Sequence, residues 1–299
     1  MRSTREGYGA ALLKLGKNKN VVALSADLTG STKADAFAEK YPTRFFQSGV
    51  AEQNMLSMAT GLALEGKIPF ASSFGVFVPM RCLDQIRIGV CYNLANVKIV
   101  ATHCGLATGE DGATHQALED VAALRALPGI TIIEPCDYKQ AMEATKAAAK
   151  HRGPVYLRLH RGKFNDIKTF GFKIGKAQVL KTGNKVTIIS SGPIINEVMK
   201  IADSIKGVEI INCHTIKPLD HETILKSVKK TKNVIVVQDH QKIGGLGSAV
   251  CELLSQENPV KVKVIGVNDK FAESGSPEEL WKRYGLSSEA ILKEIKERK

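Results

Sequence analysis

Short, mostly apolar runs alternate with helix-length segments through the first half of this chain. The runs lie at 21–26, 68–74, 97–102, 130–133 and 154–159, and each has the length of a buried strand. Parallel neighbours in a sheet need a crossover connection, which is usually a helix. The order of these segments therefore predicts an α/β fold with a doubly wound, mainly parallel sheet.

A second series of strand-like runs follows a polar connector that contains Gly and Lys. Its runs begin near residues 186, 208, 234 and 262. The chain has 299 residues, which exceeds the usual size of one hydrophobic core, so two domains are expected. We predict a first domain at 1–163, a linker at 164–176 and a smaller α/β domain at 177–299.

The charge balance favours anionic ligands. The chain has 42 basic and 30 acidic residues, which gives a net charge of +12. Aromatic residues make up 6%, the lysines are scattered, and no helix-turn-helix, zinc-finger or RNA-recognition pattern is present. We therefore expect no nucleic-acid partner, and phosphorylated small molecules fit the excess charge.

Targeting and cysteine patterns limit the location. No apolar run approaches the roughly 18 residues of a membrane span, and the first residues lack the apolar core of a secretory signal. A cytoplasmic protein without membrane contact is expected. The six cysteines form no Cys-x-x-Cys pair, which argues against a structural zinc site and against a disulfide framework.

The segment Gly109–Gln116 crowds two carboxylates, a hydroxyl, an imidazole and an amide into eight residues. The strand predicted at 97–102 ends just before it, and His103 lies at the exit of that strand. Open α/β sheets bind ligands beyond the carboxyl ends of their strands. We therefore predict a ligand site that includes Asp111 and His115. A solvated turn is the alternative, because Gly, Asp and Thr are common loop residues.

Glu52 falls in the first turn of a helix predicted at 52–65. A glutamate there can simply complement the helix dipole. Its sequence neighbours Val50, Ala51 and Met55 are apolar, however, and no basic residue adjoins it. We therefore expect a desolvated carboxyl group, in which the charged form is disfavoured.

Further candidate positions fall at predicted strand ends or helix starts. Phe74 and Phe77 form either an aromatic wall or ordinary core. Ser31 is expected to begin a helix, where its hydroxyl would cap backbone N–H groups or hold an anion. Asp27, Phe74, His103 and Arg161 end or follow different parallel strands, so we expect them to converge on one rim of the sheet.

Four stretches of the sequence resemble the carboxyl-terminal half of transketolases. They are Ser-Ala-Asp-Leu-Thr-Gly-Ser at 25–31, Gly-Val-Ala-Glu-Gln-Asn-Met at 49–55, the aromatic segment at 74–77, and the stretch at 102–116. The string Glu-Asp-Gly-x-Thr-His-Gln in the last stretch is the specific part. The second half of the chain is similar to the final domain of thiamine diphosphate enzymes, so the resemblance extends over essentially the whole chain.

The resemblance implies that this chain binds the pyrimidine end of thiamine diphosphate. Glu52 matches the glutamate that hydrogen-bonds the pyrimidine ring nitrogen and favours the tautomer that deprotonates the thiazolium carbon. Phe74 and Phe77 match the aromatic residues that pack on the pyrimidine. Met80 stands in the same pocket where many transketolases have a tyrosine, and the Cys104-Gly105 pair replaces their Asp-Ser.

The resemblance also implies a sugar-phosphate site. Asp111 and His115 match groups that bind the hydroxyls and carbonyl of the donor and acceptor sugars, so His115 and Asp111 join Glu52 as the expected catalytic residues. The residues that match the phosphate site are Arg5, Ser31, His103 and Arg161. Guanidinium groups suit a phosphate because they bind its oxygens in pairs.

A metal site is missing from this pattern. Transketolases hold the cofactor diphosphate through a metal bound by a Gly-Asp-Gly segment and an Asn in an amino-terminal domain. The similar string here, Glu110-Asp-Gly112, is already part of the loop. The resemblance therefore implies half of a split transketolase, with Mg²⁺ or Ca²⁺ bound by an N-terminal partner subunit in a dimer of heterodimers.

The implied reaction moves a two-carbon ketol unit from a ketose phosphate such as xylulose 5-phosphate to an aldose phosphate such as ribose 5-phosphate, as in the pentose phosphate pathway. Three alternatives remain: half of a 1-deoxyxylulose-phosphate synthase, a 2-oxoacid dehydrogenase beta-like subunit, and a non-catalytic regulatory relative. The string at 110–116 argues against the two other enzymes, because related enzymes vary this loop. The matched charged positions argue against loss of catalysis.

Overall fold

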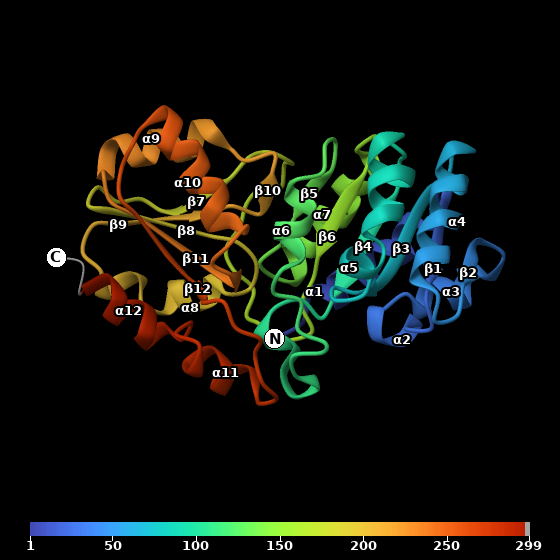
Figure 1. Cartoon of the computed structure of the whole chain (residues 1–299), viewed down its shortest axis with the longest axis horizontal. Helices are drawn as coiled ribbons and strands as arrows, with labels where there is room; N and C mark the ends of the chain where they lie inside the picture. The colour runs from blue at the N-terminus through green and yellow to red at the C-terminus, as the bar shows by residue number, and fades with distance from the viewer. Residues whose placement is uncertain (297–299) are drawn as a thin grey trace.

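The computed structural model describes residues 1–296, which form two β-sheets lying side by side, each packed against helices (Figure 1). The blue-to-green part of the chain builds most of the first sheet, and the yellow-to-red part builds the second (Figure 1). Both sheets are mainly parallel. The predicted fold class, two α/β domains, is confirmed, whereas the boundaries at 163 and 176 stay a prediction.

The first sheet has seven strands in the order β10-β5-β6-β4-β3-β1-β2. β10 pairs antiparallel with β5, and the other neighbours are parallel. β1, β4, β5 and β6 are buried at every residue, as expected for strands covered on both faces. The bounds are β1 Val21–Ser25, β2 Phe45–Gln47, β3 Ile68–Phe74, β4 Lys98–Thr102, β5 Thr131–Ile133, β6 Val155–Arg158 and β10 Thr215–Lys217.

Capped helices connect and cover these strands. The Ser3 side chain and Glu6 form a reciprocal capping box at the start of α1, and Asp137 caps α7. The helices are α1 Thr4–Leu15, α2 Thr29–Thr32, α3 Asp35–Lys40, α4 Glu52–Leu64, α5 Val78–Arg81, α6 Asp120–Arg125 and α7 Tyr138–Lys150. The shorter or wider turns are η1 Pro42–Arg44, η3 Leu106–Asp111 and the π-helical η2 Gln85–Tyr92.

The second sheet has five strands in the order β12-β11-β8-β9-β7, with β7 antiparallel to β9 at one edge. Its strands are β7 Gln178–Lys181, β8 Val186–Ser190, β9 Val208–Asn212, β11 Val234–Gln241 and β12 Val262–Val267. The helical segments are α8 Ile195–Lys200, η4 Ala202–Ser204, α9 His221–Thr231, α10 Leu246–Glu257, α11 Pro277–Arg283 and α12 Ser288–Lys296. Within residues 1–296, no helix has both the length and the apolar character needed to cross a bilayer.

β10 was not expected from the sequence. It lies in the chain between β9 and α9, yet it joins the first sheet, where Thr215 pairs with Ile133 of β5. Three residues carry too short a pattern to be recognised as a strand. The second half of the chain therefore supplies the edge of the first sheet, which ties the two halves together.

The prediction that Ser31 begins a helix is wrong. Ser31 lies inside the four-residue α2, and Lys33 ends that helix with a φ of 66° in the left-handed region. The hydroxyl of Thr32 donates to the carbonyl oxygens of Leu28 and Thr29 instead of capping a following helix. α3 begins four residues after Ser31, at Asp35.

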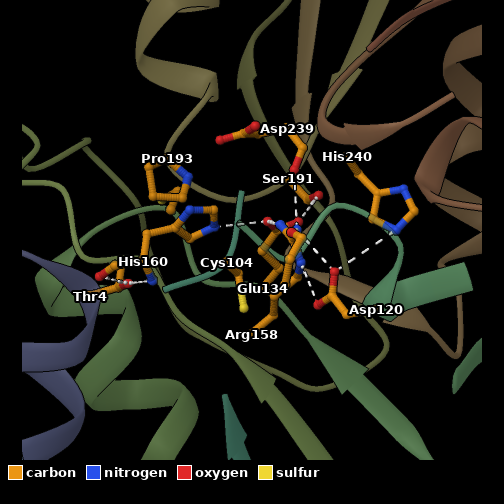
Figure 2. Close-up of polar contacts among 12 residues, drawn as sticks. Thr4, Cys104, Asp120, Glu134, Arg158, His160, Ser191, Pro193, Asp239 and His240 are labelled. Carbon is orange, nitrogen blue, oxygen red and sulfur yellow. Dashed lines mark hydrogen bonds and ion pairs between the residues drawn. The ribbon is translucent and has the colours of Figure 1, made fainter. Parts of the chain in front are cut away.

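A buried polar cluster lies where the two halves meet (Figure 2). We call Asp120, Glu134, Arg158, His160 and Ser191 the interdomain network. Arg158 on β6 donates to Asp120 at 2.8 Å and to Glu134, and it also donates to the Asp239 carbonyl oxygen of β11 at 3.1 Å. Glu134 accepts from His160 and from the Ser191 hydroxyl, which follows β8. The network therefore bridges the first and second sheets.

Candidate functional site

The predicted site residues gather beyond the carboxyl ends of neighbouring strands. β6, β4, β3 and β1 are adjacent in the first sheet, and Arg161, His103 and Phe74 follow or end three of them. The Phe74 and His103 rings lie 3.7 Å apart between centroids. Arg5 Nη1 lies 3.5 Å from His103 Nε2. The predicted convergence on one rim is therefore present in the structure.

Two phenylalanines form a flat wall in this rim. Phe74 and Phe77 stack with ring centroids 5.7 Å apart and planes 17° apart. His115 sets the edge of its imidazole against both rings, at 6.0 Å from Phe74 and 5.6 Å from Phe77. Thr114 Oγ1 lies 2.9 Å from His115 Nδ1, which orients the ring. An aromatic face beside an imidazole suits a flat heterocyclic ligand.

Glu52 is paired, contrary to the expectation that no basic residue adjoins it. It begins α4 and is 2% exposed, and Arg81 at the end of α5 donates to its Oε2 at 2.7 Å. Arg81 also lies over the Phe77 ring, with Cζ 4.6 Å from the centroid. The carboxyl group is buried as predicted, but its setting is charged because the fold brings in a side chain 29 residues away.

Arg5 and His103 lie together beside Phe74. Arg5 Nη1 donates to the Ser31 carbonyl oxygen at 2.8 Å, so Ser31 contacts the site through its backbone. Burial and the nearby Arg161 lower the pKa of Arg5. Burial, with Arg5 and Arg161, lowers the pKa of His103 to about 3, so this imidazole is neutral at neutral pH. An anion placed here would meet guanidinium charge and imidazole hydrogen bonds.

Arg161 and Asp111 form an ion pair at the outer edge of the rim. Arg161 Nη1 donates to Asp111 Oδ2 at 3.0 Å and to the Thr108 carbonyl oxygen at 3.0 Å. Both side chains are 36% exposed. The pair joins a residue predicted to bind phosphate with one predicted to bind sugar hydroxyls. A phosphorylated sugar would therefore meet both charges together.

The loop at 105–116 is held by the second half of the chain. Leu106 N–H donates to Asp239 Oδ1 at 2.9 Å, and Gln116 Nε2 donates to the Glu273 carbonyl oxygen at 3.1 Å. Gly105 has a φ of 74°, and a Cβ there would overlap the Asp239 carboxylate. Trp281 of α11 donates to the same carboxylate at 3.2 Å. The second domain therefore positions a loop of the rim without entering it.

Two further features of the site concern the position of Met80 and the side chains that could bind a metal ion. Met80 lies on α5 beside Arg81 and is 45% exposed. In the part of the chain that the structure describes, no three His, Cys, Asp or Glu side chains are grouped to hold a metal ion. We call the gathered residues the rim site; they are Arg5, Glu52, Phe74, Phe77, Arg81, His103, Asp111, His115 and Arg161.

Comparison with known protein families shows which family this chain belongs to. The sequence model described as "Transketolase, pyrimidine binding domain" matches residues 1–166, and "Transketolase, C-terminal domain" matches residues 175–291. The chain belongs to the transketolase family. Membership implies thiamine diphosphate as the cofactor of the family and confirms the resemblance to a transketolase carboxyl-terminal half.

Relatives that match over nearly their whole length include a "Putative transketolase C-terminal section" of Methanocaldococcus jannaschii. It is 45% identical over 307 residues, which cover 99% of this chain and 96% of the relative. A "6-deoxy-6-sulfo-D-fructose transketolase subunit" of a Clostridium species is 38% identical, over 99% of this chain and 95% of the relative. A solved "Split gene transketolase, inactive beta4 tetramer" is 41% identical, with a TM-score of 0.90 over 99% of this chain and 98% of that one.

The rim site fits the pyrimidine end of the transketolase cofactor. Glu52 offers a carboxylate near the stacked Phe74 and Phe77 rings. The flat Arg81 guanidinium donates a hydrogen bond to this carboxylate and lies over the Phe77 ring. A flat nitrogen heterocycle needs the same two surfaces. The sequence did not reveal Arg81 as part of the site or Asp239 as a residue that holds its loop, because neither lies within a matched motif and their partners are distant in the chain.

Proposed function

We propose that this chain is the C-terminal subunit of a split transketolase, active with an N-terminal partner subunit. The reaction proposed is transfer of a two-carbon ketol unit from a ketose phosphate of the xylulose 5-phosphate type to an aldose phosphate of the ribose 5-phosphate type, in the cytoplasm and within the pentose phosphate pathway. The observation that carries the proposal is the buried Glu52 carboxylate beside the stacked Phe74 and Phe77 rings, in a chain whose relatives are transketolase halves.

Glu52 and the aromatic wall would hold the cofactor pyrimidine. The Glu52 carboxyl, which is 2% exposed, would hydrogen-bond a ring nitrogen of the pyrimidine. Phe74 and Phe77 would fix the plane of the ring by stacking. Thiamine diphosphate, once bound, supplies the electron sink for carbon–carbon bond cleavage. His115 stands against the same wall, within reach of a substrate oxygen.

The basic side of the rim site would bind the sugar phosphate. Arg5 and His103 lie 3.5 Å apart; burial lowers the pKa of both, and the charge of Arg161 lowers them further. The guanidinium groups of Arg5 and Arg161 suit a phosphate dianion, since charge-assisted hydrogen bonds to phosphate are strong. Asp111, paired with Arg161, would accept hydrogen bonds from sugar hydroxyls.

Exposed hydrophobic side chains on and near α4, α5 and η2 support the proposed partner. α4 and η2 pack side by side, and large hydrophobic side chains on and around them are open to solvent. Tyr92 is 82% exposed and Val50, two residues before Glu52, is 75% exposed. The other exposed members are Leu64, Met80, Ile88 and Leu94. A group of exposed hydrophobic side chains of this kind is typical of a protein interface. The N-terminal subunit would cover it and bring the Mg²⁺ or Ca²⁺ and diphosphate site to the rim, two such pairs making a heterotetramer.

Reconstitution with the N-terminal subunit tests the proposal. The mixed complex, with thiamine diphosphate and Mg²⁺, is assayed for ketol transfer from xylulose 5-phosphate to ribose 5-phosphate and for consumption of pyruvate. Ketol transfer that needs both subunits is the expected result. Pyruvate consumption without ketol transfer would instead indicate a deoxyxylulose-phosphate synthase or oxoacid dehydrogenase half, and no activity with either would favour a regulatory relative.

The Clostridium relative favours a second candidate substrate. That relative is named for 6-deoxy-6-sulfo-D-fructose, a sugar that carries a sulfonate where a sugar phosphate carries its terminal phosphate. The Arg5 and Arg161 guanidiniums would bind either anion through the same kind of hydrogen bonds. Competition between the sulfonated sugar and xylulose 5-phosphate in the reconstituted complex decides between them: the preferred donor has the higher kcat/KM.

A further inference from the structure

Arg81 links the two groups that the proposed function gives to the cofactor pyrimidine. Its Nη1 donates to Glu52 Oε2 at 2.7 Å, and its Cζ lies 4.6 Å from the centroid of the Phe77 ring. Gln53, the neighbour of Glu52, donates through Nε2 to the Arg81 carbonyl oxygen at 3.0 Å. The ion pair with Glu52 and the contact with the Phe77 ring therefore hold the guanidinium, and the hydrogen bond from Gln53 holds the Arg81 backbone.

These contacts are those that a flat basic heterocycle would make. A guanidinium is planar, donates N–H bonds in its plane and stacks on aromatic faces. A pyrimidine held by Glu52 and Phe77 would use the same carboxyl group and the same aromatic wall. Glu52 has little further room, because it is 2% exposed and fixed in the first turn of α4. Both ligands cannot occupy this place together.

We propose that Arg81 is an internal ligand of the pyrimidine site, which occupies Glu52 and Phe77 until the pyrimidine of thiamine diphosphate displaces it. This inference rests on the proposed function. While the pair is formed, Glu52 is a carboxylate that shares no proton with a ring nitrogen. Arg81 thus holds the chain in a state that cannot activate the cofactor, and its departure prepares the carboxyl for that role.

The local structure explains why Arg81 is present and how it leaves. A buried carboxylate without a partner lowers the stability of the fold, so the Arg81 cation stabilises Glu52 while no cofactor is bound. Arg81 is the last residue of the four-residue α5, its side chain is 46% exposed, and Cys82 after it has non-helical backbone angles. The side chain can therefore swing into solvent without disturbing the first sheet.

The displacement predicts a measurable change in cofactor affinity. An internal ligand multiplies the apparent dissociation constant by the inverse of the fraction of free sites. An ion pair combined with a cation–π contact, when formed about nine-tenths of the time, weakens binding about tenfold. A substitution that removes the guanidinium but keeps an unbranched apolar side chain should therefore lower the apparent dissociation constant by the same factor.

The test uses the complex with the N-terminal subunit and thiamine diphosphate in excess Mg²⁺ as the probe. Equilibrium dialysis measures the dissociation constant for wild type, Arg81→Met and the control Arg152→Met, an exposed arginine after α7 that belongs to neither α4 nor η2. We expect Arg81→Met to bind the cofactor about tenfold more tightly, equivalent to about 1.4 kcal/mol. Arg152→Met should stay within about twofold of wild type, since surface charges contribute little.

A double variant checks that the effect runs through Glu52. In the Glu52→Gln background the internal ligand has lost its anchor, so adding Arg81→Met should change the dissociation constant less than about twofold. Unchanged or weaker cofactor binding by Arg81→Met overturns the internal-ligand proposal alone. Absence of saturable binding by the wild-type complex overturns the proposed function with it.

Discussion

The rim site and the interdomain network contain the same kinds of charged side chains but use them differently. In the network, Arg158 is 1% exposed and Asp120 is 0% exposed, and the guanidinium donates to carboxylates and carbonyl oxygens from both halves of the chain (Figure 2). In the rim site, Arg81 and Arg161 are 46% and 36% exposed, and each holds a carboxylate from one side.

This difference separates structural charges from charges available to a ligand. Burial alone would raise the pKa of Glu134, yet Arg158, His160 and Ser191 hold it well below its ordinary value, so this carboxyl group stays ionised beside Arg158. The rim pairs have one face in solvent, where they can exchange partners at small cost. We expect substitutions in the network to change stability and substitutions in the rim site to change binding and catalysis.

Arg158→Ala should have the largest effect on stability. It leaves the Asp120 and Glu134 carboxylates buried without their cation, which costs about 3–5 kcal/mol of unfolding free energy. Urea unfolding measures the loss, and Arg152→Ala, an exposed arginine ahead of β6, is the control. A loss below about 1 kcal/mol would place Arg158 with the exposed pairs and break the contrast.

Glu52→Gln should reduce turnover of the reconstituted complex at least about 100-fold, the usual contribution of a positioned proton-transfer group. Its partner Arg81 is partly exposed, so unfolding free energy should fall by no more than about 1 kcal/mol. Steady-state assays and urea unfolding measure the two effects, with Glu65→Gln just beyond α4 as the matched control. Full activity in Glu52→Gln would remove this residue from the reaction.

Acid should weaken the interdomain region through His240. Burial lowers the pKa of His240 to about 4, so the folded chain keeps it neutral while the unfolded chain binds a proton below about pH 6.5. Stability is therefore lost as pH falls through that window, by about 2 kcal/mol at pH 5 for this one group. Urea unfolding at pH 7 and pH 5 should show a smaller pH effect in His240→Gln. The same reduction in His221→Gln, an exposed histidine, would contradict this assignment.

Arg161→Ala should have the smallest of these effects, and a selective one. Loss of one charge-assisted hydrogen bond, with Asp111 left unpaired, should raise KM for phosphorylated sugars about tenfold. The unphosphorylated donor hydroxypyruvate serves as the control substrate, and its KM should change less than about twofold. Equal changes for both donors would show that Arg161 does not bind the phosphate group.

Local patterns in the sequence were sufficient for the elements and for most of the rim. Runs such as 97–102 and 186–190 are apolar enough to identify strands, and parallel pairing places their carboxyl ends together. The motif at 109–116 and the position of Glu52 predict the site without any knowledge of its contacts.

Long-range contacts were not predictable in the same way. Arg81 and Glu52 are 29 residues apart, and Leu106 and Asp239 are 133 apart. No periodicity or spacing encodes such a pair, since it depends on how helices and strands from separate segments pack. The crossing of β10 into the first sheet has the same origin. Sequence therefore located the ligand groups, whereas the fold supplied the groups that control them.

The central claim is that this chain works as half of a transketolase, and its natural complex tests that claim most directly. The tagged chain is purified from its own cells under native conditions, and the intact complex is weighed by mass spectrometry. We predict a second chain, carrying a Gly-Asp-Gly and Asn metal motif, with thiamine diphosphate retained. A homo-oligomer of this chain alone, without the cofactor, would contradict the account.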